Sequence, residues 1–123
     1  MNPFSTEIRR LRELRGFRQK EAAEKLGYEA SYLSAIELGQ KDPPKYAAFL
    51  EKLVKTYQLT EAEHLNLKEL LLLSKRTLTI SRNASEEEFY IGHQLESKFG
   101  TLNKHQIYLI KIALCLNELS IKN

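Results

Sequence analysis

Residues 18–39 read RQKEAAEKLGYEASYLSAIELG, and they constrain the fold of this chain more than any other stretch. Apolar residues recur at helical spacing over residues 19–26 and again over residues 30–38. Gly27 lies between the two segments and tolerates the positive φ with which many helices end. Glu29 precedes the second segment, where it can cap a helix and its charge suits a helix N-terminus. Two short helices joined by so tight a turn must cross steeply, so one of them projects from the surface.

Further residues extend this pattern from Ile8 to about Pro44. The matching positions are Ile8, Leu11, Arg12, Gln19, Ala23, Leu26, Gly27, Leu33, Ile36, Glu37 and Gly39. In type and spacing they resemble the phage-repressor-like (XRE) helix-turn-helix family, which includes the lambda repressor and Cro proteins. The resemblance implies a small all-α domain that binds double-stranded DNA by placing residues 30–38 in the major groove. It also implies a transcriptional regulator, and we expect a repressor because repression is the commoner mode in this family.

The resemblance assigns base reading to the outward side of residues 30–38. The residues there that we expect to contact bases are Ala30, Ser31, Tyr32, Ser34 and Ala35. A serine hydroxyl can donate to or accept from a base edge, and an alanine methyl can pack on the thymine methyl group. The alternative is that the small residues only let the helix sit deep in the groove. Family members often carry glutamine where Ala30 and Ala35 stand, so these two positions offer no bidentate readout of adenine.

We expect phosphate contacts from residues that flank this helix, and for Gln19 the family resemblance itself implies one. These are Arg18, Gln19 and Lys20 before it, and Gln40, Lys41 and Lys45 after it. Residues 1–59 carry eleven Lys and Arg against eight Asp and Glu, whereas residues 60–123 carry eight of each. The whole positive excess of +3 therefore lies in the half of the chain that we expect to bind DNA. For any one cation the alternative is an ordinary solvated charge.

Arg12 and Glu37 have a different expected role. In the family the residues at these two positions form an ion pair between the first and third helices. Such a pair would fix the orientation of the DNA-reading helix, so we expect Arg12 and Glu37 to be structural.

The chain reads as helical almost throughout, and we expect a domain boundary near residue 59. Residues 1–59 are predicted to form the DNA-binding domain, and residues 60–123 a helical C-terminal region that joins two copies. Residues 77–82 differ, because Leu78 and Ile80 alternate with polar residues at the period of a short strand. This segment is either an extended linker or a strand that pairs with its copy in a second subunit.

The last predicted helix runs from about residue 103 to Leu119 and is apolar on all sides. A lone surface helix would keep a polar face, so this one is expected to be covered by its own chain or by a partner. We favour a homodimer, because two helix-turn-helix units can read the half-sites of a palindromic operator. The alternative is an antitoxin or adaptor that binds another protein through residues 60–123.

Other features bear on the remaining functional classes. The single cysteine, Cys115, excludes an internal disulfide and suggests a reducing compartment. No segment is apolar over the length of a membrane span and the N-terminus lacks the core of a signal peptide, so we expect a cytoplasmic protein. The three histidines are far apart in sequence and no glycine-rich phosphate loop is present. We therefore expect no enzymatic activity, no bound metal and no cofactor.

Overall fold

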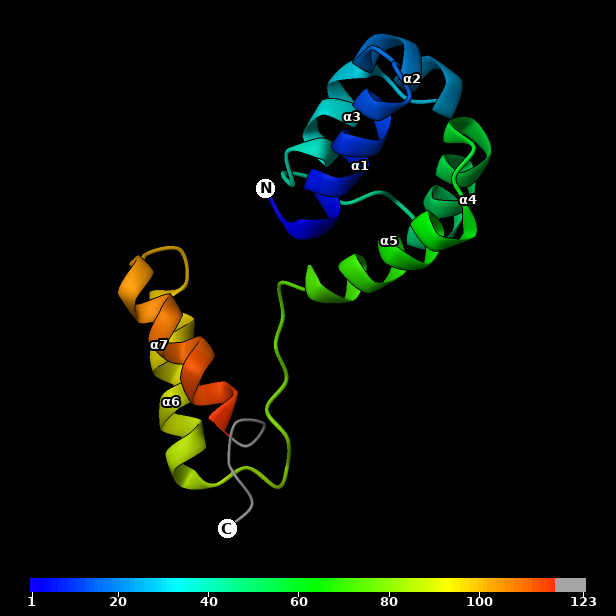
Figure 1. Cartoon of the computed structure of the whole chain (residues 1–123). Helices are drawn as coiled ribbons and strands as arrows, with labels where there is room; N and C mark the ends of the chain where they lie inside the picture. The colour runs from blue at the N-terminus through cyan, green and yellow to red at the C-terminus, as the bar shows by residue number, and fades with distance from the viewer. Residues whose placement is uncertain (117–123) are drawn as a thin grey trace. The chain divides into compact units, whose positions relative to one another are not determined.

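The computed structural model describes residues 1–116, which form seven α-helices (Figure 1). In chain order these are α1 (Pro3–Leu14), α2 (Gln19–Leu26), α3 (Ala30–Glu37), α4 (Tyr46–Tyr57), α5 (Glu61–Leu73), α6 (Glu86–Lys98) and α7 (Lys104–Leu114). The all-α prediction is confirmed. The described residues contain no strand, so residues 77–82 form an irregular segment between α5 and α6. Leu119, the expected end of the last helix, lies outside the described residues.

The chain divides into two compact units, residues 1–77 and residues 78–123. The first unit extends beyond the boundary near residue 59 that the sequence suggested, because α5 packs against α1 and α4. Leu67 of α5 is fully buried in the same core as these helices. Thr60 and Glu63 form a capping box just after residue 59, and it begins a helix of the first unit.

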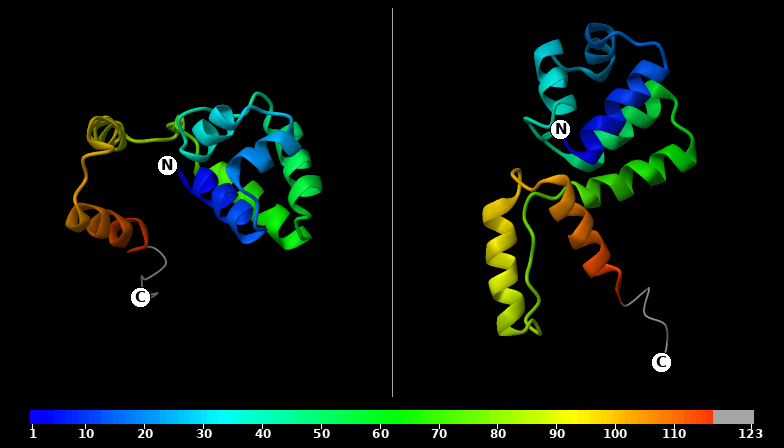
Figure 2. Two further views of the ribbon diagram at one scale, coloured as in Figure 1. Left: turned by 90° about the horizontal axis from the view of Figure 1, so that it is seen from above. Right: turned by 60° about the vertical axis from the view of Figure 1, so that its left-hand side comes forward.

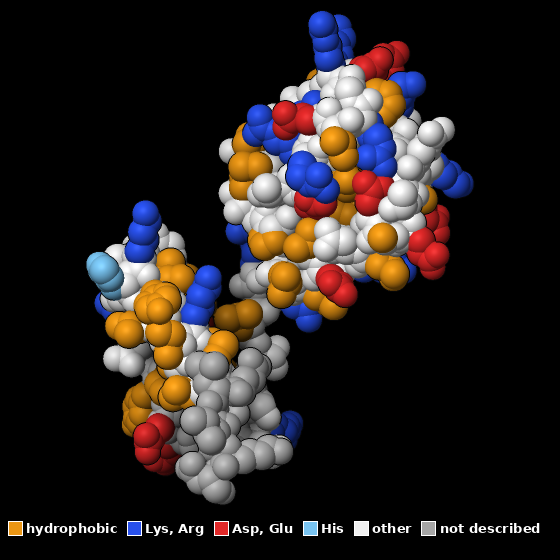
Figure 3. All heavy atoms as spheres, in the orientation of Figure 1, with side chains coloured by type: hydrophobic (Ala, Val, Ile, Leu, Met, Phe, Trp, Pro, Cys, Tyr) orange, Lys and Arg blue, Asp and Glu red, His pale blue; other side chains and the backbone are white. Residues whose placement is uncertain are grey.

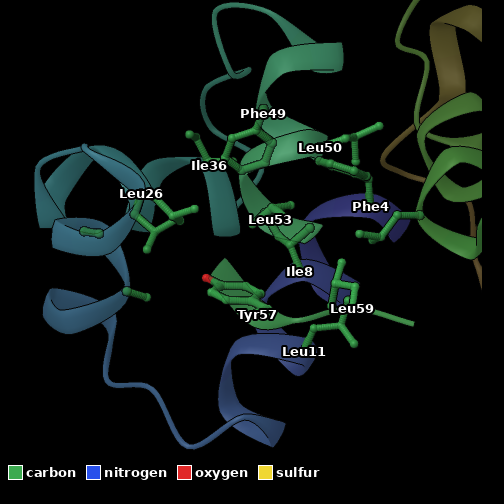
Figure 4. Packing of buried hydrophobic residues seen from close by; sticks show 14 residues of the cluster. Phe4, Ile8, Leu11, Leu26, Ile36, Phe49, Leu50, Leu53, Tyr57 and Leu59 are labelled. Carbon is green, nitrogen blue, oxygen red and sulfur yellow. The ribbon is translucent and has the colours of Figure 1, made fainter. Parts of the chain in front are cut away.

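One apolar core holds the first unit together (Figure 4). Phe4, Ile8 and Leu11 recur at i, i+4 and i+7 on α1, and each is at most 4% exposed. The other members are Ala22, Ala23, Leu26, Leu33, Ile36, Phe49, Leu50, Leu53, Tyr57, Leu59 and Leu67. Since burying a large apolar side chain contributes roughly 1.5–3 kcal/mol, this core supplies the main driving force for folding of the unit.

Polar contacts fix both ends of α1 within the unit. The backbone N–H of Phe4 donates to Ser74 Oγ at 3.0 Å, at the end of α5. At the other end Arg15 Nε donates to the Tyr57 carbonyl at 2.8 Å, and Arg15 Nη2 donates to Glu63 Oε1 at 2.5 Å. The hydrogen bond from Arg15 is the main reason that the pKa of Glu63 is lowered. These contacts tie the start and the end of α5 to α1.

The second unit consists of α6, α7 and the segment that leads into α6 (Figure 2). Both helices begin with a capping box, built on Ser85 in α6 and on Asn103 in α7. Ile80 lies against Gly92 of α6, where an added Cβ would come within 3.1 Å of Ile80 Cδ1. No residue from 78 to 116 is buried. The described part of this unit therefore has no closed apolar core of its own.

Candidate nucleic-acid interface

The turn between α2 and α3 forms as the sequence predicts. Gly27 has a φ of 83° and ends α2 in the left-handed conformation. The backbone N–H of Tyr28 donates to the Ala23 carbonyl at 2.8 Å, which closes the end of the helix. Glu29 occupies the N-cap position of α3, but its side chain accepts no capping hydrogen bond. Glu29 therefore takes the expected N-cap position without a side-chain capping hydrogen bond.

The outward side of α3 carries short side chains. Ser31 is exposed, while Ala30, Ser34 and Ala35 are partly exposed. The opposite side of the helix is buried in the core of the first unit. Short side chains let a helix backbone approach base edges closely, so this face is shaped for a groove. The contacts of these four residues with bases remain a prediction.

Tyr32, the fifth predicted base reader, is engaged with its own chain. Its hydroxyl donates to the Asp42 carbonyl at 3.1 Å, in the loop that follows α3. Its ring packs edge-on against Tyr28, with 5.3 Å between ring centroids, and Lys41 Nζ lies 5.9 Å from its centroid. The hydroxyl oxygen can still accept a hydrogen bond from DNA. Tyr32 thus positions the loop that carries Lys41.

A buried ion pair joins α1 to α3. Arg12 Nε donates to Glu37 Oε2 at 2.8 Å, and Arg12 Nη2 donates to Glu37 Oε1 at 3.0 Å. Arg12 Nη1 also donates to the Phe17 carbonyl at 2.8 Å. Arg12 is 8% exposed and Glu37 is 1% exposed. The hydrogen bond with Glu37 raises the pKa of Arg12, and the two-pronged geometry fixes α3 relative to α1.

Gln19 at the start of α2 joins this pair. Its side-chain Nε2 donates to Glu37 Oε1 at 3.1 Å. This amide nitrogen carries two N–H groups, so one is engaged by the buried carboxylate and the other can still donate to a phosphate. The backbone N–H of Gln19 lies in the first turn of α2 and has no acceptor within that helix. Gln19 thus offers a backbone N–H and one side-chain N–H for a phosphate contact.

An open cleft of about 430 Å³ lies beside the N-terminus of α2. It is lined by Gly16, Arg18, Lys20, Glu21 and Glu24. Arg18 is the N-cap residue of α2, and both it and Lys20 are exposed. The two cations therefore lie at the helix end where backbone N–H groups and the helix dipole favour an anion.

The residues predicted to contact phosphates after α3 are also exposed. Gln40 and Lys41 lie in the loop, and Lys45 is the N-cap residue of α4. The described structure gives none of these three side chains a hydrogen bond or an ion pair. Gln40 and Lys45 are therefore free to contact a ligand, and Lys41 can do so from its place beside the Tyr32 ring.

The helices of this region differ from the others in the capping of their N-termini. In α1, α5, α6 and α7 a capping box satisfies N–H groups of the first turn. In α2, α3 and α4 the N-cap side chain makes no such hydrogen bond. The first turns of these three helices therefore keep backbone donors that a polyanion can satisfy.

A contact that the sequence does not indicate supports α3 at its C-terminal end. Arg76, just after α5, donates through Nη2 to the Gly39 carbonyl at 2.5 Å. Gly39 has a φ of 75° and lies against the chain start, where an added Cβ would approach Asn2, Met1 and Ser5 within 3.3 Å. Gly39 and Arg76 are far apart in sequence, and no local pattern links them.

Residues 1–116, the described part of the chain, also bear on other kinds of site. In that range no three His, Cys, Asp or Glu side chains lie together in a way that could hold a metal ion. No helix within the same residues has the length and apolar character needed to cross a membrane.

Comparison with known proteins gives two matches. A family model described as a helix-turn-helix domain matches residues 3–67, which is more than half of the chain. Among solved structures, one chain of a SinR protein/SinI protein complex is similar, at 24% sequence identity and a TM-score of 0.44. The match covers 95% of this chain and 99% of that chain. No curated protein matches the chain in sequence.

Proposed function

Since this chain belongs to the XRE-like family of helix-turn-helix DNA-binding regulators, we propose that it is a sequence-specific repressor that binds a palindromic operator as a homodimer. The proposal places the protein in the cytoplasm and gives it no catalytic activity. The observation that carries it is the exposed, short-chained face of α3 beside helix ends that lack side-chain caps.

In this proposal α3 enters the major groove. Ser31 and Ser34 form hydrogen bonds with base edges, and Ala30 and Ala35 contact thymine methyl groups. This face carries no long amide side chain. Part of the specificity therefore comes from the shape and deformability of the operator.

Phosphates bind on both sides of α3. On one side they meet the first turn of α2, with the backbone N–H of Gln19 and the side chains of Arg18 and Lys20. On the other side they meet Gln40, Lys41 and the N-terminus of α4 at Lys45. These contacts set the register of the protein on DNA and carry no sequence information themselves.

Selection of bound sequences from random double-stranded DNA tests the proposal most directly. We expect a palindromic consensus whose half-sites are centred about one helical turn, or 10 base pairs, apart. We also expect affinity to fall steeply as salt concentration rises, because phosphate contacts release counterions. Enrichment of a single unrepeated half-site would contradict the homodimer.

Two single substitutions distinguish residues that position the protein on phosphates from residues that read bases. Lys41→Ala should weaken binding by a similar factor for every DNA sequence and reduce the salt slope by about 1. Ser31→Ala should change the preferred base at one position in each half-site. Lys68→Ala, which removes an exposed cation from α5, serves as the control and should leave both properties unchanged. An unchanged consensus for Ser31→Ala would remove Ser31 from the set of base readers.

The exposed apolar residues of the second unit favour a second candidate function, an antitoxin or adaptor that binds another protein. The two functions differ in what the chain does with DNA. Failure to enrich any sequence, together with DNA binding that is insensitive to salt, would favour the protein-binding function.

A further inference from the structure

The described part of the second unit, residues 78–116, shows a large apolar surface (Figure 3). Between residues 78 and 116, twelve large apolar side chains are at least 36% exposed, and Leu114, Tyr90 and Leu78 reach 77%, 72% and 68%. At roughly 100 Å² for each side chain, they offer on the order of 1,000 Å² of apolar surface. A stable interface needs about 800 Å² from each partner, and the exposed apolar total is of that order, with Ile91 and Leu109 lining the groove between α6 and α7.

A groove runs between α6 and α7, which diverge from the loop that joins them (Figure 2). Its volume is about 330 Å³ and its lining is mainly apolar. From α6 it is lined by Ile91, Gln94, Leu95 and Lys98. The unit thus presents an open apolar trough that its own described residues do not fill.

The side of α6 that lines this groove continues beyond it to Glu87, and its charge changes from one end of the helix to the other. Glu87, Ile91, Leu95 and Lys98 follow at helical spacing, so they lie on one side of the helix. Glu87 and Lys98 are eleven residues apart, or about 16 Å along the axis. This stripe is therefore acidic at one end, apolar in the middle and basic at the other.

Such a stripe is complementary to itself only when the second copy is reversed. Two antiparallel copies bring Glu87 of each onto Lys98 of the other and join the apolar middles. Two parallel copies would place Glu87 against Glu87 and Lys98 against Lys98, which is repulsive at both ends. The neighbouring Glu88 is already engaged, since it accepts from Ser85 in the capping box.

We propose that a second copy of this chain covers the groove, with the two α6 helices antiparallel across a two-fold axis and Glu87 paired with Lys98 twice. The inference rests on the homodimer of the proposed function and specifies its geometry. A two-fold interface uses the same patch on both subunits, so each α6 occupies the groove of the other and both grooves close at once. The two α7 helices then flank the central pair.

A charge-swap series on the full chain tests this arrangement by sedimentation equilibrium. Glu87→Lys and Lys98→Glu each replace two attractions with two repulsions, and each should raise the dimer dissociation constant roughly tenfold at low salt. The double variant Glu87→Lys/Lys98→Glu restores opposite charges at both contacts. Its dissociation constant should return to within about threefold of the wild-type value, since the pair is only inverted.

Glu86→Lys is the matched control. Glu86 lies in the same first turn of α6, so its reversal disturbs the helix dipole as Glu87→Lys does, but it points away from the stripe. We expect it to leave the dissociation constant unchanged, with far-UV circular dichroism checking helix content in every variant.

The possible failures are distinguishable. A dimer whose affinity is the same in all four variants would overturn the antiparallel pairing and leave a dimeric repressor intact. A wild-type chain that is monomeric at tens of micromolar would overturn the second copy as occupant. DNA selection would then show independently whether specific DNA binding stands.

Discussion

At the scale of single residues, Glu37 is the most constrained side chain of the first unit. Its carboxylate accepts from Arg12 twice and from Gln19 once, and it is almost fully buried. We expect Glu37→Ala to lower the free energy of unfolding by about 3–5 kcal/mol, because Arg12 is left as an unpaired buried charge. DNA binding should be lost through loss of the fold.

Urea unfolding measures this effect, with Glu13→Ala as the control. Glu13 pairs with Arg9 at the surface, and removing it should change stability by about 1 kcal/mol or less. If Glu37→Ala kept its melting temperature yet lost DNA binding, Glu37 would have a role in contacting DNA instead.

Tyr57 presents the opposite case, a buried polar atom without a partner. The side chain is 2% exposed, and its hydroxyl has no hydrogen bond to any described residue. Burial raises the pKa of this hydroxyl above its ordinary value. We expect Tyr57→Phe to raise the free energy of unfolding by about 1 kcal/mol, because an unsatisfied buried group is removed and the ring is kept. A decrease in thermal stability would show that the hydroxyl has a partner in solution.

At the scale of elements, equivalent capping boxes have different consequences in the two units. Thr60 caps α5, which is part of the first core, and Ser85 caps α6, which is not. Thr60→Ala should therefore lower the stability of the first unit by about 1 kcal/mol. Ser85→Ala should leave unfolding of the first unit unchanged, and equal losses in thermal denaturation would contradict the separation of the units.

The elements also show which features of the fold can be predicted from the sequence and which cannot. The capping boxes at Thr60 and Ser85 and the turn at Gly27 were predictable, because each depends on residues within a few positions. The place of α5 in the first unit was not predictable in this way, since it depends on burial of Leu67 by helices distant in sequence.

In the candidate site, too, features that depend on neighbouring residues were predictable and features that depend on distant elements were not. The exposed face of α3 follows from helical periodicity, so the sequence indicated which residues point outward. The hydrogen bonds of Gln19, Tyr32 and Arg76 did not follow, because their acceptors belong to other elements. Family resemblance implied an ion pair between Arg12 and Glu37, and in the structure the two side chains are in contact.

At the scale of the whole molecule, the boundary between the units predicts which fragments fold. A fragment of residues 1–77 keeps α5, with Leu67 in the core and Glu63 bonded to Arg15. We expect it to unfold cooperatively near the melting temperature of the first unit in the full chain. A fragment of residues 1–59 exposes the surface that α5 covers and should melt at a clearly lower temperature or fail to fold. Equal melting temperatures would restore the boundary near residue 59.

Under the proposed function, phosphates of the operator bind the uncapped N-termini of α2 and α4, so the operator stabilises the folded protein. A ligand that binds only the folded form adds RT ln(1 + [L]/Kd) to its stability, or about 2.7 kcal/mol at a hundredfold excess over Kd. The protein free in solution is then its least stable functional form. Substitutions that supplied those two caps would stabilise the free protein and compete with the phosphates for the same backbone donors. Higher thermal stability would consequently come with lower operator affinity at these two helix ends.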